Sequence, residues 1–262
     1  MVKSLETALI KKRSILSIYF TAGFPKLDDT LPILNALEKT GKVDLVEIGF
    51  PFSDPIADGK VLQESSQLAI KNGMTLHYLL DLLKEAKSRI AIPIVLMGYL
   101  NPIIQYGVEK FCEAARDANV RGVIIPDLPY EVYEKEYENC FKMNGLSNIL
   151  LITPESGEER IKMVMKRTQG FLYVVSASST TGTTRGLNDE KTITYFNMIK
   201  SLERKMDMNI VKLVGFGISN AASFRQACKY ADGAIIGSAF VKMLHETKDL
   251  KEGISQFIHS VK

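Results

Sequence analysis

The feature that most constrains the fold is a series of short apolar runs, which recur along the whole chain and are separated by segments of helical periodicity. The runs are continuous stretches rich in Val, Ile and Leu, a pattern typical of parallel strands covered by helices. The eight predicted strands are Ile15–Phe20, Leu45–Gly49, Ile94–Met97, Gly122–Ile125, Asn148–Ile152, Phe171–Val175, Val211–Gly215 and Gly233–Ile236.

Amphipathic segments fill the gaps between these runs, with apolar residues spaced three and four apart. An additional helix over Ser4–Lys12 precedes the first strand and could plug the bottom of a barrel. Gly73 separates two helices as a predicted C-cap. The other predicted helices are Asp28–Thr40, Val61–Asn72, Thr75–Arg89, Val108–Ala118 and Glu190–Lys205.

Eight strand–helix units in 262 residues, with no linker or change of composition between them, predict one (β/α)8 TIM barrel with an extra N-terminal helix. We therefore expect residues 1–262 to form a single TIM-barrel domain. A doubly wound sheet is the alternative, and the lack of a dinucleotide-binding fingerprint disfavours it.

Charge and cysteine content narrow the functional class. A formal net charge of +3 is too small to indicate a nucleic-acid surface. The three cysteines are widely spaced and form no Cys/His cluster, so we expect no metal site and a reducing compartment. No apolar run reaches membrane-spanning length and the N-terminus lacks a signal core, which predicts a cytoplasmic protein with no membrane partner.

Glu47 is the first candidate catalytic residue, because barrel enzymes carry their chemistry at the C-terminal ends of the strands. It alternates with Val46 and Ile48 and so faces the barrel interior if those residues face the helices. A buried carboxyl group has a raised pKa, which suits an acid or base near neutral pH. The alternative is a structural acid paired with a lysine or a backbone amide.

Two further carboxylates, Asp54 and Asp58, lie in the loop that follows this strand. Taken alone, Asp58 could be a helix N-cap or a turn residue, and Asp54 a turn or interface residue. The sixth predicted strand leads into Ser176–Gly186, a loop of small polar residues. This loop could close over a ligand or be merely flexible.

Glycine turns open the last two helices, in the sequences Gly215-Phe216-Gly217-Ile218-Ser219 and Ile236-Gly237-Ser238-Ala239. Glycine lets backbone amides approach an anion, and a helix N-terminus favours negative charge. Two such turns in the last two units of a barrel predict a phosphate site.

Together these motifs resemble the tryptophan synthase alpha subunit family, in order over nearly the whole chain. The motifs are YFTAGFP, PFSDPIADG after the strand that bears Glu47, the Tyr99–Pro102 exit, PDLP, GFGIS and GSA. The resemblance implies retro-aldol cleavage of indole-3-glycerol phosphate to indole and glyceraldehyde 3-phosphate. It also implies an alpha2beta2 heterotetramer with a beta subunit, which carries the pyridoxal phosphate, so that no cofactor is expected in this chain.

The resemblance also implies residue roles. Glu47 would be the general acid/base and Asp58 the acceptor for the indole N–H. The implied substrate-binding residues are Tyr19, Leu100, Tyr173 and Thr181; the phosphate binders are Gly182, Gly217, Gly237 and Ser238; and the partner interface holds Asp54, Pro55 and Asn101.

Two positions depart from the family pattern. Ser179 stands where a glycine is common and would be strained at a positive φ, while Tyr19 stands where Phe is frequent and adds a hydroxyl to the pocket wall. Two rival functions stay open at this point. One is a lysine-dependent aldolase or sugar-phosphate isomerase, for which Lys212 is a poorly placed Schiff-base candidate. The other is an inactive barrel that serves as a structural partner.

Overall fold

Parallel strands form the centre of the molecule. The computed structural model describes residues 4–56, 58–176 and 189–262, and the nine strands in these ranges are joined in the order β5-β4-β3-β2-β1-β9-β8-β7-β6. They are β1 (Ile15–Thr21), β2 (Leu45–Gly49), β3 (Ile94–Met97), β4 (Val120–Ile124), β5 (Ser147–Asn148), β6 (Leu151–Ile152), β7 (Leu172–Val175), β8 (Lys212–Gly215) and β9 (Gly233–Ile236).

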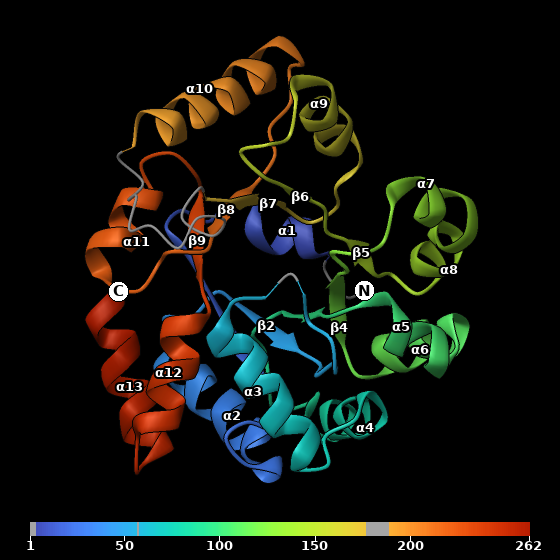
Figure 1. Cartoon of the computed structure of the whole chain (residues 1–262), viewed down its shortest axis with the longest axis vertical. Helices are drawn as coiled ribbons and strands as arrows, with labels where there is room; N and C mark the ends of the chain where they lie inside the picture. The colour runs from blue at the N-terminus through green and yellow to red at the C-terminus, as the bar shows by residue number, and fades with distance from the viewer. Residues whose placement is uncertain (1–3, 57, 177–188) are drawn as a thin grey trace.

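The two ends of this order belong to one stretch of chain, because β5 and β6 are separated by only two residues. Between them the Ile149 N–H donates to the Val123 carbonyl at 3.0 Å, and the Leu150 carbonyl accepts from the Tyr173 N–H at 3.1 Å. The fifth strand position thus bonds to β4 on one side and to β7 on the other. The predicted eight-stranded barrel is confirmed, with its fifth strand split in two (Figure 1).

Helices surround this sheet (Figure 1). Five of the longer ones follow the predicted helices to within a few residues, since each buries one apolar face against the strands: α2 (Thr30–Thr40) after the short η1 (Leu27–Asp29), α3 (Lys60–Lys71), α4 (Leu76–Ala86), α6 (Val108–Asp117) and α10 (Glu190–Lys205). Helices α11 (Ala221–Ala227) and α12 (Ser238–Glu246) begin after the two glycine turns, as expected, whereas α9 (Glu158–Arg167) and α13 (Leu250–Val261) have no counterpart among the predicted helices.

The N-terminal helix α1 (Leu5–Leu9) lies beneath the barrel, as predicted, although it is shorter than the expected segment. Leu5 and Leu9 are buried. The side chain of Leu5 is so close to Gly170, just before β7, that an added Cβ there would lie 2.6 Å from Leu5 Cδ2. The N-terminal ends of the strands are therefore closed, which leaves the opposite end for a site.

One helix stands where the sequence predicted only a strand exit. Helix α5 (Leu100–Tyr106) begins directly after β3, and its Leu100 N–H donates to both Asp127 carboxylate oxygens, at 3.0 and 3.2 Å. Pro102 is the third residue of this helix, where its missing N–H costs nothing. The helical stretch α7 (Tyr130–Val132), η2 (Tyr133–Tyr137) and α8 (Glu138–Met143) was also not predicted.

The strands bury every side chain of β1 and β2, including polar ones. Val46 and Ile48 are fully buried on the helix-facing side, and Glu47 between them is fully buried in the interior. Within the described ranges, no helix is long and apolar enough to cross a membrane.

Candidate active site

Glu47 occupies the interior face of β2, as its alternation with apolar neighbours predicted. Its carboxyl is fully buried, and the Ser17 hydroxyl of β1 donates to Oε1 at 2.7 Å. The second oxygen, Oε2, has no hydrogen-bond partner among the described residues. Burial raises the pKa of Glu47 to about 8, against a smaller lowering effect of the Ser17 hydrogen bond. Glu47 is therefore a protonated acid at neutral pH.

Asp58 lies in the loop between β2 and α3. The N-cap of α3 is Gly59, which has no side-chain cap bond, so Asp58 does not cap this helix. Its backbone is fixed by an N–H bond to the Pro55 carbonyl at 3.0 Å and by Gln63 Nε2, which donates to the Asp58 carbonyl at 2.9 Å. Burial raises the pKa of the Asp58 carboxyl to about 6, while a hydrogen bond from Tyr99 opposes the increase.

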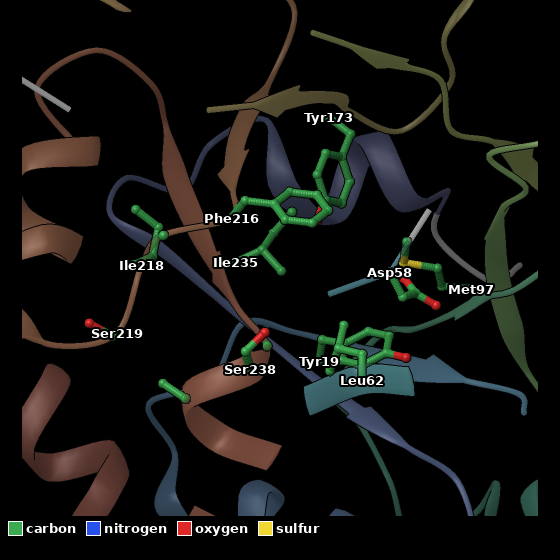
Figure 2. Close-up of a pocket in the computed structure, with 13 residues that line it drawn as sticks. Tyr19, Asp58, Leu62, Met97, Tyr173, Phe216, Ile218, Ser219, Ile235 and Ser238 are labelled. Carbon is green, nitrogen blue, oxygen red and sulfur yellow. The ribbon is translucent and has the colours of Figure 1, made fainter. Parts of the chain in front are cut away.

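A cavity of about 210 Å³ lies among the C-terminal ends of the strands (Figure 2). Its lining includes six of the predicted site residues: Tyr19, Asp58, Tyr173, Gly217, Gly237 and Ser238. Sequence reasoning did not assign Leu62, Met97, Phe216, Ile218, Ser219, Ile235 or Ala239, which complete the wall. Several of these flank the two glycine turns, and that proximity was the available signal. Glu47 does not line the cavity, because its carboxyl is fully buried.

The two tyrosines form opposite sides of this cavity: Figure 2 shows Tyr173 and Phe216 across from Tyr19, with Asp58 at one end. Strand-end glycines make room for both hydroxyls. A Cβ at Gly49 would lie 2.1 Å from the Tyr19 hydroxyl, and one at Gly215 would lie 2.3 Å from that of Tyr173. Aromatic rings on both sides of the cavity suit an aromatic group between them.

The other end of the cavity is built from the glycine turns. Phe216 and Gly217 both have left-handed backbones, with φ of 68° and 72°, and the Ser176 hydroxyl donates to the Phe216 carbonyl at 2.9 Å. Helix α12 begins at Ser238 with Gly237 as its N-cap, so its free amides lie at the cavity wall. Such a helix start favours an anion.

The remaining predicted residues lie elsewhere or outside the described residues. Pro55 is buried beside a smaller cavity of about 20 Å³ that shares Tyr19, Asp58 and Met97 with the first. Asp54 and Asn101 are exposed, and Leu100 is half-buried at the start of α5. Thr181, Gly182 and Ser179 fall within residues 177–188, outside the described part of the chain.

Lys212 lies at the opposite end of the barrel, at the first residue of β8. Its ammonium group contacts Glu203 at 2.6 Å and Asp232 at 3.7 Å, and it lies away from the cavity. Paired in this way, Lys212 is not available as a Schiff-base nucleophile. Within the described ranges, no group of three or more His, Cys, Asp or Glu side chains is arranged to hold a metal ion.

The fold and the site together define a (β/α)8-barrel enzyme with a cavity at the C-terminal ends of its strands and two nearby carboxyl groups, those of Glu47 and Asp58, whose pKa values are raised by burial. A family profile described as tryptophan synthase alpha chain matches residues 5–261. The chain belongs to the tryptophan synthase alpha chain family.

Individual relatives agree with this assignment. The tryptophan synthase alpha chains of Parabacteroides distasonis and Flavobacterium johnsoniae are each 48% identical to this chain; the alignments cover 96% of both chains in the first case and 97% of both in the second. Among solved structures, Mycobacterium tuberculosis tryptophan synthase is similar with a TM-score of 0.85 and 28% identity, covering 100% of this chain and 99% of that one. A mutant alpha subunit from Pyrococcus furiosus has a TM-score of 0.83 and 33% identity, covering 95% and 98%.

The reaction of this family is the retro-aldol cleavage of indole-3-glycerol phosphate to indole and glyceraldehyde 3-phosphate, a step of tryptophan biosynthesis. The chain is therefore a lyase.

Proposed function

We propose that Glu47 and Asp58 together carry out the cleavage. The observation that supports this most strongly is the separation of their pKa values, about 8 for Glu47 and about 6 for Asp58. At neutral pH one group is a neutral acid and the other an anion. Two carboxyl groups whose environments separate their pKa values are the usual sign of distinct acid and base roles.

The chemistry follows from these charge states. Glu47 donates its proton to C3 of the indole ring, and Asp58 accepts a hydrogen bond from the ring N–H as positive charge develops on nitrogen. The Glu47 carboxylate then removes the proton of the adjacent glycerol hydroxyl. As the aldehyde forms, the electrons of the breaking C–C bond return to the ring, which restores neutral indole and protonated Glu47.

Glu47 has to move for this reaction, since its carboxyl is buried against Ser17 and does not line the cavity. A change of its side-chain torsions would carry the carboxyl toward the mouth, where the ring of the substrate would lie between Tyr19 and Tyr173. Leu100 and Thr181 complete the proposed substrate contacts, by analogy with the family. Asp58 needs no such movement, because it already lines the cavity.

The phosphate group of the substrate is proposed to bind at the opposite end, on Gly217, Gly237 and Ser238, and, by analogy with the family, on Gly182. The N-terminus of α12 supports this assignment, since its first amides have no partner within the helix. The cavity then holds the ring near Asp58 and the phosphate near α12.

A charge placed at this helix start tests the phosphate assignment. Ser238→Asp should raise the KM for indole-3-glycerol phosphate by about tenfold or more, because like charges repel where the helix favoured an anion. Ser238→Ala keeps the backbone amide and should change KM only a few-fold. An unchanged KM in the aspartate variant would remove Ser238 from the phosphate site.

The pH dependence of kcat/KM should be bell-shaped, with an acidic limb near 6 and an alkaline limb near 8. Asp58 must be ionised, so activity falls as pH decreases below its pKa. Glu47 must start protonated, so activity falls as pH increases above its pKa. A profile that stays flat between pH 5 and 9, measured below saturation, contradicts the assigned charge states.

We also propose that the chain works as the alpha subunit of an alpha2beta2 assembly whose beta subunit holds the pyridoxal phosphate. Asp54, Pro55 and Asn101 would contribute to the interface. Ile56, next to them, supports this, because its side chain is 88% exposed and would be covered by a partner. The three free cysteines favour a reducing compartment, in keeping with the cytoplasm.

The proposed function is tested by an indole-release assay on the purified chain, with and without a beta subunit. Borohydride treatment in the presence of substrate provides a second test, directed at the lysine-dependent rival. We expect indole release and no covalent adduct. A trapped adduct would rule out the acid/base mechanism in favour of a Schiff base.

A further inference from the structure

The hydrogen bond between Ser17 and Glu47 is the only polar contact of the proposed catalytic acid among the described residues. We propose that Ser17 is a positioning residue: its hydroxyl holds the Glu47 carboxyl in a withdrawn resting position and sets how tightly that carboxyl keeps its proton. This inference rests on the proposed role of Glu47 and names the group that controls it.

The strand register shows which way the carboxyl points. Glu47 is paired with Tyr19 across β1 and β2, whereas Ser17 is paired with Leu45. In parallel strands Ser17 is therefore two residues closer to the closed end of the barrel than the level of Glu47. A Glu47 side chain that reaches Ser17 leans toward that closed end, away from the cavity. The Ser17 bond thus stabilises the position from which Glu47 cannot touch a ligand in the cavity.

The hydrogen bond from Ser17 determines which carboxyl oxygen of Glu47 carries the acid proton. The single hydroxyl hydrogen of Ser17 is donated to Oε1, so the acid proton of neutral Glu47 belongs on Oε2. Oε2 is buried and has no partner in the described part of the chain. A buried donor without an acceptor is unfavourable, so the resting position is only lightly held. Substrate in the cavity would offer the missing partner once the carboxyl turns.

Ser17 is the group near Glu47 that opposes the effect of burial on the pKa of the carboxyl. Tyr19 on β1 and Tyr173 on β7 are its titratable neighbours: the pKa values of both tyrosines are raised first by burial, with contributions from Glu47 and from Asp58. For Glu47 itself, burial raises the pKa, and Ser17 alone lowers it. No cation among the described residues contributes. Removing the hydroxyl should therefore strengthen proton binding by Glu47.

The test compares Ser17→Ala and Ser17→Thr with the wild-type chain, each assembled with a beta subunit, through the pH dependence of kcat/KM for indole-3-glycerol phosphate. Ser17→Ala should move the alkaline limb upward by about one pH unit, because the carboxylate form loses its only hydrogen bond. Ser17→Thr keeps a hydroxyl and should return the limb toward its wild-type position.

The results of this comparison distinguish a failure of the proposed role of Ser17 from a failure of the proposed role of Glu47. An alkaline limb that stays in place in Ser17→Ala, with Glu47→Gln inactive, overturns the role of Ser17 alone. A merely structural serine would give that result, with lower stability or kcat and no shift of the limb. An active Glu47→Gln overturns the proposed function itself. A limb that moves in Ser17→Ala and returns in Ser17→Thr supports the positioning role.

Discussion

Glu47→Gln should reduce the rate of indole release by about 10²–10⁴-fold, the usual contribution of one general acid/base group. The amide keeps the size of the side chain and can still accept the Ser17 hydrogen bond, but it cannot donate a proton to C3 and take one back. Binding of indole-3-glycerol phosphate should change little, since Glu47 does not line the cavity. Single-turnover indole release and a separate binding titration measure the two effects.

Stability provides the control for this variant. The pKa of Glu47 is raised in the folded chain, to about 8, so the folded state binds its proton more tightly than the unfolded state does. The free energy of unfolding therefore falls as pH rises from the unfolded pKa of about 4.3 through 8, by roughly 3.5 kcal/mol at pH 7. The glutamine in Glu47→Gln does not ionise, so this variant does not lose unfolding free energy as pH rises. It should be at least as stable as the wild type in urea unfolding above neutral pH. Near-full turnover in this variant would show that the assignment of Glu47 is wrong.

Asp58→Asn should lower kcat by about 10²–10³-fold, the effect expected when one electrostatic partner of the transition state is lost. The amide is similar in shape and can still accept a hydrogen bond from the ring nitrogen. It carries no charge, however, and cannot stabilise the positive charge that develops there. KM should change much less than kcat, because the charge appears only as the reaction proceeds.

The pH profile gives an independent check on Asp58. If ionised Asp58 produces the acidic limb near pH 6, Asp58→Asn should lack that limb while the alkaline limb of Glu47 persists. Asp28→Asn is a control, since it changes an exposed carboxylate that lines neither cavity. An Asp58→Asn variant with wild-type turnover would return Asp58 to the role of a turn residue.

The strands could be predicted closely from the sequence because each is a buried apolar run bounded by a turn signal. Leu45–Gly49, Ile94–Met97 and Gly233–Ile236 have the predicted bounds. The division of the fifth strand was not predictable, because periodicity does not show where a strand shifts from one neighbour to the other. Helix α5 was not predictable from Pro102, because a proline after a strand fits a loop and a first helical turn equally well.

Only part of the candidate site could be predicted from the sequence. The interior position of Glu47 follows from the period of two, but its partner Ser17 lies within an apolar run and was not predicted as a site residue. The same period places Ser17 on the face of Tyr19, so the signal was present. A capping role for Asp58 depends on which residue precedes the first turn of α3, and local sequence does not distinguish Asp58 from Gly59 at that position.

The most direct test of the central claim is hydrogen exchange at C3 of indole, followed by NMR in deuterated water with the chain present. Exchange at C3 isolates the proton transfer from cleavage of the C–C bond. If Glu47 carries the proton and Asp58 stabilises the charged ring, the wild type should catalyse deuterium incorporation at C3, Asp58→Asn should do so much more slowly, and Glu47→Gln should not do so. Deuterium incorporation at the wild-type rate in Glu47→Gln would contradict the mechanism.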